Sequence, residues 1–484
     1  MDTLNDKSLI KDKCLVAGEW IGAAENVDVT NPATGEVITT VPKLGAAETE
    51  RAVAGAKAAM AGWSKMTAKE RSVIMRKWYD LMMENQEDLA RIMTAEQGKP
   101  LAEARGEVVY GASFTEFYAE EAKRIYGETI PSHKADARIV VQRQPIGVVA
   151  AITPWNFPMA MITRKVSPAL AAGCGVVCKP ASETPLTALA VAELAERAGL
   201  PSGLFSVVTG PAREIGGVLT GSDTVKALTF TGSTEIGRVL MEQCASTIKK
   251  VDLELGGNAP FIVFDDADLD AAVVGAMASK YRNAGQTCVC ANRILVQDGV
   301  YDTFAEKLAK AVMDLKVGQG TEVGVTTGPL INPAAVEKVE EHVSDAVANG
   351  AEIVVGGGRH ELGGNFYEPT VLKNVTTKML VTNEETFGPV APLFRFTTEQ
   401  EAIDLANDTE FGLASYFYSR DIGRVWRVAE ALESGIVGIN EGIISTEVAP
   451  FGGVKQSGLG REGSHHGITE FTEIKYMLMG GLAS

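Results

Sequence analysis

The chain has 484 residues, of which 45% are hydrophobic, so it is long enough for about three domains with buried cores. Its net charge of −17 argues against nonspecific nucleic-acid binding, which depends on basic patches that neutralise phosphate. Its six cysteines are too scattered for a disulfide framework, and no apolar run suggests a signal peptide or a membrane span. We therefore expect a cytoplasmic protein with neither a nucleic-acid nor a membrane partner.

Short strands and then helices are expected in the first part of the chain. Residues 28–42 mix branched side chains with Asn-Pro and Thr-Gly turns, whereas residues 46–127 have the periodicity of at least three helices. Residues 138–142 and 469–477 are isolated strand-like stretches. Because unpaired edge strands tend to be covered, we expect these two to pair with each other or with another subunit.

From residue 146 onward, apolar strands alternate with helices, which predicts a parallel sheet with covering helices. A dinucleotide-binding domain is the leading interpretation of this first block. A second alternating block follows a boundary near residues 252–256. The expected strands lie at 146–152, 175–178, 204–208 and 225–229 in the first block, and at 260–264 and 294–296 in the second.

The segment 281–293, YRNAGQTCVCANR, places Cys288 on a connection between a predicted helix (268–283) and a predicted strand (293–297). A thiol in such a place is a candidate nucleophile. Taken alone, Cys288 is more often a small buried thiol, because free cysteine is among the most buried residue types. Cys290, at the start of the strand, is still more typical of a packing residue.

Two segments of the first block are suited to a nucleotide. FTGSTEIG (230–237) supplies Gly232, Ser233 and a following helix N-terminus, which can face a phosphate, although it lacks the GxGxxG pattern and an ordinary turn fits equally well. Upstream, Lys179 at a strand end and Ser182 before a helix suit ribose or phosphate contacts. A solvated lysine and a helix cap are the alternatives.

Two further segments offer polar groups for catalysis. In TPWNFP (153–158), prolines restrict the backbone around Asn156, whose amide could stabilise an oxyanion by ~3 kcal/mol. The alternative is an amide that satisfies its own turn. In LELGGN (253–258), Glu254 precedes two glycines and could activate water, although an exposed glutamate is the commoner role.

Metal chemistry and a cysteine–histidine protease gain no support from the sequence. The five histidines show no metal-ligand spacing beyond one adjacent pair, and none lies near Cys288 in the sequence. We therefore expect no metal site.

Taken together, these segments resemble the aldehyde dehydrogenase superfamily. TPWNFP, FTGST, LELGGN, GQTC and EETFGPV (384–390) occur in the order and at the spacing of that family, and the resemblance extends from NPATGE (31–36) to PFGGVKQSGLGRE (450–462). It implies an α/β fold with a Rossmann-like cofactor-binding domain, an α/β catalytic domain and a small β oligomerisation element. The implied domain boundaries are 1–124 with 145–253, then 254–460, and 125–144 with 461–484.

The resemblance also implies roles for single residues. Cys288 would attack an aldehyde, Asn156 and the Cys288 backbone N–H would hold the oxyanion, and hydride would pass to a nicotinamide. Glu254 would activate the water that hydrolyses the resulting thioester. The implied cofactor contacts are Trp155, Lys179, Ser182, Gly232, Ser233, Glu385 and Phe387.

The cofactor and the substrate can be narrowed further on this resemblance. Relatives that prefer NAD often carry a glutamate at the place of Ser182, and a serine can instead donate to a 2′-phosphate, so we expect NADP, with NAD possible. Arg164, Arg282, Ser445 and the CVC doublet resemble the succinate-semialdehyde subfamily, in which such residues grip the distal carboxylate. The alternative is that both arginines pair with structural acids.

Several alternatives stay open at this point. The expected substrate is succinate semialdehyde, which would be oxidised to succinate. Glutarate semialdehyde is one methylene longer, and one methylene changes the binding energy in a pocket by only ~1–3 kcal/mol, so it stays an alternative. A broader aldehyde specificity is also consistent with the sequence. A dinucleotide-binding protein without catalysis and a thiol acyltransferase without redox chemistry are different classes. A homodimer or homotetramer is implied, formed through the strands near 138–142 and 470–477.

Cys290 adds a hypothesis about regulation. Two extended residues span ~6.6 Å, near the upper limit for disulfide-bonded Cα atoms, so a bridge from Cys288 to Cys290 would be strained and easily reduced. Such a bridge would be a reversible off-switch. The alternative is an inert Cys290.

Overall fold

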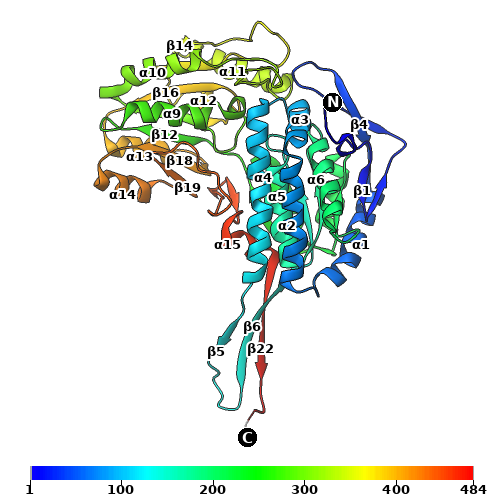
Figure 1. The fold of residues 1–484 in the computed structure, drawn as a ribbon. Helices are drawn as coiled ribbons and strands as arrows, with labels where there is room; N and C mark the ends of the chain where they lie inside the picture. Colours follow the sequence, from blue (N-terminus) through cyan, green and yellow to red (C-terminus); the bar gives the residue numbers. More distant parts are fainter. Residues whose placement is uncertain (1–2, 483–484) are drawn as a thin grey trace.

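The computed structural model describes residues 3 to 482, in which two large sheets carry most of the structure (Figure 1). The first sheet has the order β21-β11-β10-β7-β8-β9, and its neighbours are parallel except for the β11–β21 pair. Its strands are β7 (Val148–Ile152), β8 (Gly175–Lys179), β9 (Phe205–Val207), β10 (Val225–Thr231), β11 (Lys250–Glu254) and β21 (Gly458–Leu459). The predicted parallel sheet is thus confirmed.

Helices cover this sheet, so its strands need apolar side chains on both faces; every residue of β8 is buried. The helices are α1 (Ala46–Trp63), α2 (Ala68–Glu84), α3 (Gln86–Gln97), α4 (Leu101–Glu121), α5 (Ala160–Ala172), α6 (Pro185–Ala198), α7 (Ala212–Gly221) and α8 (Thr234–Ala245). Gly98 ends α3 with a φ of 94°, a conformation that favours glycine. The helices predicted within residues 46–127 are confirmed as α1 to α4.

The second sheet has the order β14-β15-β16-β13-β12-β18-β19 and is parallel except for the β14–β15 pair. Its strands are β12 (Ala259–Val263), β13 (Ala291–Gln297), β14 (Glu352–Val355), β15 (Thr370–Lys373), β16 (Val390–Phe396), β18 (Ala414–Tyr418) and β19 (Ile436–Ile439). Its helices are α9 (Leu269–Lys280), α10 (Tyr301–Met313), α11 (Pro333–Ala348), α12 (Leu380–Asn383), α13 (Glu399–Asn407) and α14 (Ile422–Ala431).

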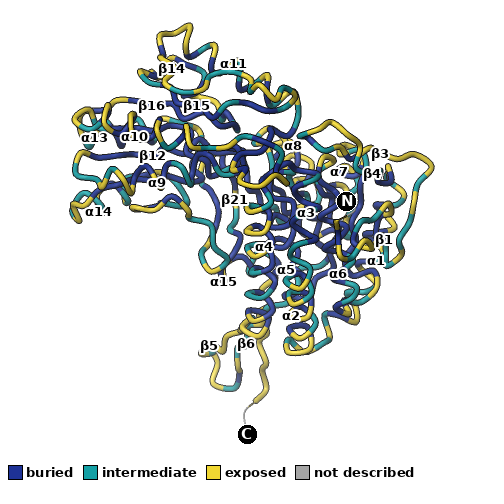
Figure 2. Tube along the Cα trace, turned by 45° about the horizontal axis from the view of Figure 1, so that its top comes forward, coloured by how far each residue is buried: buried dark blue, intermediate teal, exposed yellow. Residues whose placement is uncertain are grey.

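A third, antiparallel sheet projects from the body of the molecule (Figure 1). It contains β5 (Glu128–Ile130), β6 (Arg138–Pro145) and β22 (Thr472–Met479). Eight residues of β6 pair with β22, which confirms that the two isolated strand-like stretches pair with each other. Figure 2 shows this sheet as largely exposed.

Small elements complete the fold. Two of them, β3 and β4, confirm the strands expected near residues 28–42. No helix among residues 3 to 482 is both long and apolar enough to cross a membrane. These elements are the pairs β1 (Cys14–Val16) with β2 (Glu19–Ile21), β3 (Asn26–Thr30) with β4 (Val37–Pro42), and β17 (Phe411–Gly412) with β20 (Val454–Lys455), together with α15 (Ser464–Gly467) and the 3₁₀ turns η1 (Lys7–Leu9), η2 (Ala122–Arg124), η3 (Arg282–Gly285), η4 (Asp298–Val300) and η5 (Ile468–Phe471).

Candidate functional site

A pocket of about 220 Å³ lies beyond the carboxyl ends of β7, β10 and β11. In a parallel sheet these ends lie at one edge, which is where ligands of such folds bind. Seven of the residues singled out in the sequence line the pocket: Trp155, Asn156, Gly232, Ser233, Cys288, Glu385 and Phe387. Residues more than 200 positions apart in the chain are therefore brought to one site.

Cys288 reaches this pocket through an irregular turn. In η3, Asn283 and Ala284 have φ angles of 53° and 55°, a left-handed conformation that costs roughly 1–2 kcal/mol for each non-glycine residue. The turn leaves Cys288 half-buried, whereas Thr287 and Val289 on either side are buried. A chain that spends free energy to present one thiol to a pocket is typical of a functional site.

The surroundings of Cys288 hold it as a neutral thiol. Burial raises its pKa to about 12, and the guanidinium groups of Arg164 and Arg282 oppose that rise. Glu385 and Glu254 raise the pKa further. Because the thiolate is the reactive form, attack by Cys288 requires that its proton be removed.

Glu254 is a buried carboxylate at the end of β11. Among residues 3 to 482, neither of its carboxylate oxygens has a hydrogen-bond partner. Burial and then the charge of Glu462 raise its pKa well above the usual range, while Arg164 opposes the rise. In its ionised form a carboxylate with a raised pKa is a stronger base, so Glu254 can accept a proton from water once it is deprotonated.

A buried charge cluster, here called the Glu254 cluster, lies behind this carboxylate. It consists of Glu254, Asp252, Arg164, Lys165 and Glu462. Lys165 Nζ donates to Glu462 and, at 3.2 Å, to Thr229 Oγ1, which donates to Asp252 at 2.9 Å. Sequence reasoning missed Asp252, Lys165 and Glu462, although each lies within two residues of a motif or site residue that it had singled out.

The Asn156 side chain is held against the segment that carries Cys288. Its Nδ2 donates to the Gln286 carbonyl at 3.0 Å, and its own backbone carbonyl accepts from Lys99 and Asn283. This amide belongs to the same pocket as the thiol. The arrangement gives a nucleophile and a hydrogen-bond donor at one site, as acyl chemistry requires.

The two arginines differ in their partners. Arg164 is buried, forms an ion pair with Glu462 and lies 4.5 Å from the centroid of the Phe451 ring, so the alternative of a structural acid is observed for it. Arg282 is half-buried and lies 5.2 Å from the centroid of the Phe157 ring. Ser445 is half-buried on the loop after β19. Both guanidinium groups affect the pKa of the Cys288 thiol, but only Arg164 is paired with a buried carboxylate, so Arg282 is the more available of the two for a ligand.

Six of the seven expected cofactor contacts line two hollows, and Lys179 lines neither. Trp155 and Phe387 meet edge to face at 5.5 Å in the pocket of Cys288, and Glu385 accepts from the Gly257 N–H at 3.4 Å. Ser182 lines a second hollow of about 210 Å³, in which Lys43 is the cationic residue. Lys179 is buried, and its Nζ donates to the Pro180 carbonyl at 3.0 Å.

The turn between β10 and α8 fits a phosphate. A Cβ on Gly232 would lie 2.4 Å from the Phe230 ring, so only glycine fits there without a shift of that ring. Ser233 caps α8, and its side chain accepts from the Ile236 N–H at 3.4 Å. The residues just before this twelve-residue helix thus line the pocket, which places the helix N-terminus beside it, as anion binding requires.

Cys290 lies two residues from Cys288 in different surroundings. It is buried, and its Sγ donates to the Lys280 carbonyl at 3.4 Å. Both cysteines are free thiols. A bridge between them would require Cys290 to leave this contact.

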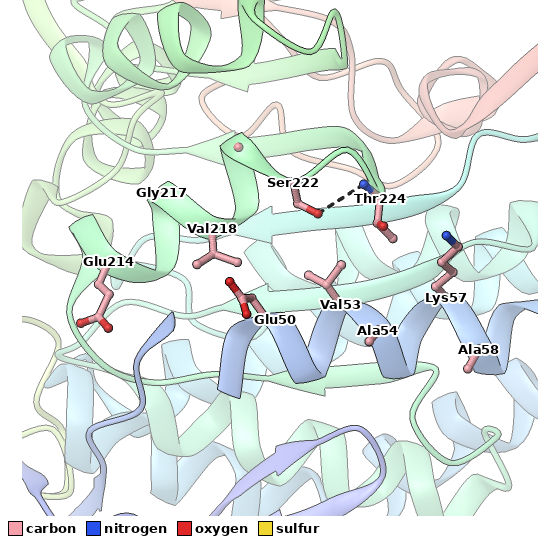
Figure 3. A pocket seen from close by; sticks show the side chains of 11 residues that line it. Glu50, Val53, Ala54, Lys57, Ala58, Glu214, Gly217, Val218, Ser222 and Thr224 are labelled. Carbon is pink, nitrogen blue, oxygen red and sulfur yellow. Dashed lines mark hydrogen bonds between the residues drawn. The ribbon is translucent and has the colours of Figure 1, made fainter. Parts of the chain in front are cut away.

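A larger groove of about 1060 Å³ lies elsewhere, between α1 and α7 (Figure 3). Small side chains from both helices, among them Val53, Ala54 and Val218, form its walls, and the charged side chains of Glu50 and Lys57 also line it. None of its lining residues is a cysteine or a histidine. The candidate nucleophile Cys288 lies in the smaller pocket.

Comparisons with known proteins agree with this geometry. The model of the aldehyde dehydrogenase family matches residues 20–477. The chain is 65% identical to a protein of Pseudomonas aeruginosa named glutarate-semialdehyde dehydrogenase, over 99% of this chain and 100% of that one. It is also 65% identical to an Escherichia coli protein named succinate-semialdehyde dehydrogenase (NADP(+)) GabD, over 99% of each. A solved structure described as an E. coli NADP dependent enzyme superposes with a TM-score of 0.98 at 64% identity, covering 99% of this chain and 100% of the other.

Proposed function

This chain belongs to the aldehyde dehydrogenase family and has its fold, and on that premise we propose that it oxidises succinate semialdehyde to succinate while reducing NADP⁺. One observation carries the proposal. The Cys288 thiol and the Asn156 amide line one pocket. Two guanidinium groups lie near enough to the thiol to oppose the rise of its pKa that burial causes. An aldehyde with a negatively charged tail suits such a site, since the protein as a whole is acidic.

The chemistry begins at Cys288. After its proton has passed to solvent, the Cys288 thiolate attacks the aldehyde carbon to form a thiohemiacetal, and the Asn156 amide donates to the new oxyanion. A bound nicotinamide would supply the acceptor for the hydride that leaves this carbon. The thioester left on Cys288 is hydrolysed by a water whose proton passes to Glu254, and the acid leaves with the thiol restored.

The distal carboxylate would be held by Arg282, with Ser445 and the remaining donors of Arg164. Arg282 is the principal group in this proposal because Arg164 is already paired with Glu462. The names of two relatives support it, since each refers to the semialdehyde of a dicarboxylic acid. A guanidinium fork is the side chain best shaped to recognise such a tail.

Glutarate semialdehyde is the second candidate, because one of these relatives is named for it. The test is to measure kcat/KM for both semialdehydes and for butanal, which lacks the carboxylate. We expect both charged substrates to exceed butanal by roughly 10²-fold, and the preferred chain length to be the better of the two by roughly tenfold. Equal kcat/KM for butanal would remove the carboxylate clamp from the proposal.

NADP is the proposed cofactor, with NAD as an alternative. Trp155, Gly232, Ser233, Glu385 and Phe387 would hold its nicotinamide half, and Lys179 and Ser182 its adenosine ribose. The support is that Ser182 lines a hollow with Lys43, where a 2′-phosphate would find a hydroxyl donor and a lysine that is paired with Glu25 at 2.7 Å and would exchange that partner. Replacing Ser182 with glutamate should lower kcat/KM for NADP at least tenfold and spare NAD. Unchanged NADP kinetics would overturn this assignment.

Assembly into a homodimer or homotetramer in the cytoplasm completes the proposal, and the domain boundaries expected from the sequence remain part of it. The support for assembly is the projecting sheet, where Ile474, Tyr476 and Met479 are more than half exposed. Light scattering on the full chain measures the state. A monomer at micromolar concentration would contradict it.

A further inference from the structure

Lys99 is a buried lysine that the reaction scheme above does not use. Its side chain is 1% exposed, and its Nζ lies 2.5 Å from a Glu107 oxygen and 2.8 Å from the backbone carbonyl of Asn156. Resting on the proposed role of Asn156, we propose that Lys99 is a positioning residue that fixes the oxyanion-binding amide relative to the nucleophile.

Glu107 extends this hold to the far side of Asn156. Its other oxygen accepts from the backbone N–H groups of Met159 at 3.0 Å and Ala160 at 3.3 Å, where α5 begins. The ion pair therefore grips the loop from residue 156 to residue 160 at both ends. A loop held in this way has little freedom to move its amide.

The same carbonyl joins the Asn156 loop to the Cys288 segment. Asn283 Nδ2 donates to the Asn156 carbonyl at 3.0 Å and to the Gln286 carbonyl at 3.3 Å, and Asn156 Nδ2 donates to the Gln286 carbonyl. The backbone N–H of Asn283 donates to Glu103 at 2.9 Å. Lys99, Glu103, Glu107 and Asn283, here called the Lys99 cluster, thus connect α4 to both loops of the site.

Phe157 connects Lys99 to Arg282, the residue proposed to hold the distal carboxylate of the substrate. Lys99 Nζ lies 4.0 Å and Arg282 Cζ 5.2 Å from the centroid of its ring, so one aromatic ring contacts both cations. Cation–π contacts of this kind are worth roughly 0.5–2 kcal/mol. A shift of Lys99 would therefore also move the group proposed to hold the distal carboxylate.

A purely structural ion pair is the competing explanation. Buried pairs often add little net stability, so stability alone gives a weak reason for a lysine here. What distinguishes Lys99 is that its second bond goes to the residue that carries the catalytic amide. A positioning role predicts that its effect depends on that amide, whereas a structural role does not.

A double-mutant cycle tests the difference. Lys99→Met should lower kcat by roughly 10²-fold in the wild type, because displacements of about 1 Å have effects of this size. In the Asn156→Ala background the same change should cost less than about twofold, since the positioned group is gone. Cofactor affinity, measured by fluorescence titration, should stay within about twofold in each variant.

Lys249→Met is the matched control, because Lys249 is also buried but donates to the carbonyls of Thr220 and Ser222, outside both loops. It should lower the Tm and leave kcat unchanged. If Lys99→Met does not fold, Glu107→Gln keeps the shape and the acceptor for α5 and should show the same dependence on Asn156 at a smaller size.

Two outcomes separate the hypotheses. Equal losses for Lys99→Met in both backgrounds would overturn the positioning role and leave the proposed function standing. An Asn156→Ala variant with wild-type kcat would instead remove the oxyanion role on which the proposed function depends.

Discussion

Two buried charge clusters lie next to residues of the site, and they differ in how completely their charged atoms are bonded. In the Lys99 cluster, both Glu107 oxygens accept hydrogen bonds and Lys99 Nζ has two oxygen partners and an aromatic ring. In the Glu254 cluster, both Glu254 oxygens and Arg164 Nη2 have no hydrogen-bond partner among residues 3 to 482. One cluster holds the Asn156 amide, and the other contains Glu254, the proposed base.

This difference separates buried charges that hold neighbouring groups in place from buried charges that are available for a chemical step. A buried polar group without a partner costs about 1–3 kcal/mol, so folding alone does not explain its presence. A fully bonded group resists displacement and keeps its neighbours in place. We therefore expect substitutions in the Glu254 cluster to change the chemical steps, and those in the Lys99 cluster to change geometry.

The largest expected effect is at Glu254. Glu254→Gln keeps the shape of the side chain but cannot accept the proton of water, so hydrolysis of the thioester should slow by roughly 10²–10⁴-fold. The first turnover should persist as a burst of reduced nicotinamide, measured by stopped-flow absorbance. A variant with no burst but unchanged steady-state turnover would place Glu254 outside hydrolysis.

The same substitution bears on stability. Because burial raises the pKa of Glu254 in the folded state, the folded protein holds this proton more tightly than the unfolded chain. The contribution of this group to the free energy of unfolding is full below its unfolded pKa and is lost as the pH rises through the folded value. Urea titrations at pH 6 and 8 should show a smaller decline for Glu254→Gln than for the wild type.

The sequence predicted the parts of the site that lie in short motifs at strand ends. Asn156, Gly232 and Glu254 follow or end neighbouring parallel strands, so the sheet alone brings them together. Cys288 was predictable as the thiol on a connection. Local pattern and the resemblance together were therefore enough to place these residues near one another, and their catalytic roles stay predictions.

The two clusters were not predictable in the same way, because they depend on distant partners. Lys165 and Glu462 are 297 positions apart, and a lysine in a sequence gives no sign that it will be buried. The left-handed turn at Asn283 and Ala284 likewise runs against local preference and is held by Glu103. Arg164 shows the limit most clearly, since sequence suggested a substrate clamp and the fold supplies Glu462 as its partner.

A comparison of the two arginines would sharpen this contrast. Arg282→Leu should lower kcat/KM for succinate semialdehyde by roughly 10- to 150-fold, the equivalent of about 1.5–3 kcal/mol for a charged hydrogen bond, and should spare butanal. Arg164→Leu should lower activity toward both substrates, because it leaves Glu462 buried without its arginine. Equal selectivity in the two variants would mean that Arg164 is a clamp rather than part of the Glu254 cluster.

The protonation of Cys288 gives a smaller, graded effect. Since burial raises its pKa to about 12, the thiolate is a minor form throughout the neutral range. The alkylation rate by iodoacetamide in the ligand-free enzyme should therefore rise about tenfold per pH unit between pH 7 and 9. Mass spectrometry of the labelled peptide measures it, with Cys288→Ser as the control. A plateau below pH 8 would mean that the arginines outweigh burial.

The smallest expected effect on basal activity is at Cys290. Cys288 and Cys290 are two residues apart, yet one is exposed to the pocket and the other is bonded within the protein. Cys288 faces the pocket, whereas Cys290 is buried against the Lys280 carbonyl, so Cys290→Ala should keep kcat within about twofold. Its proposed role appears only under oxidation: peroxide converts the Cys288 thiolate to a sulfenic acid, and the Cys290 thiol displaces water to form a disulfide that a dithiol reduces. Prolonged peroxide should then inactivate the wild type reversibly and Cys290→Ala irreversibly. Full recovery of Cys290→Ala with dithiothreitol would make Cys290 a packing residue without a redox role.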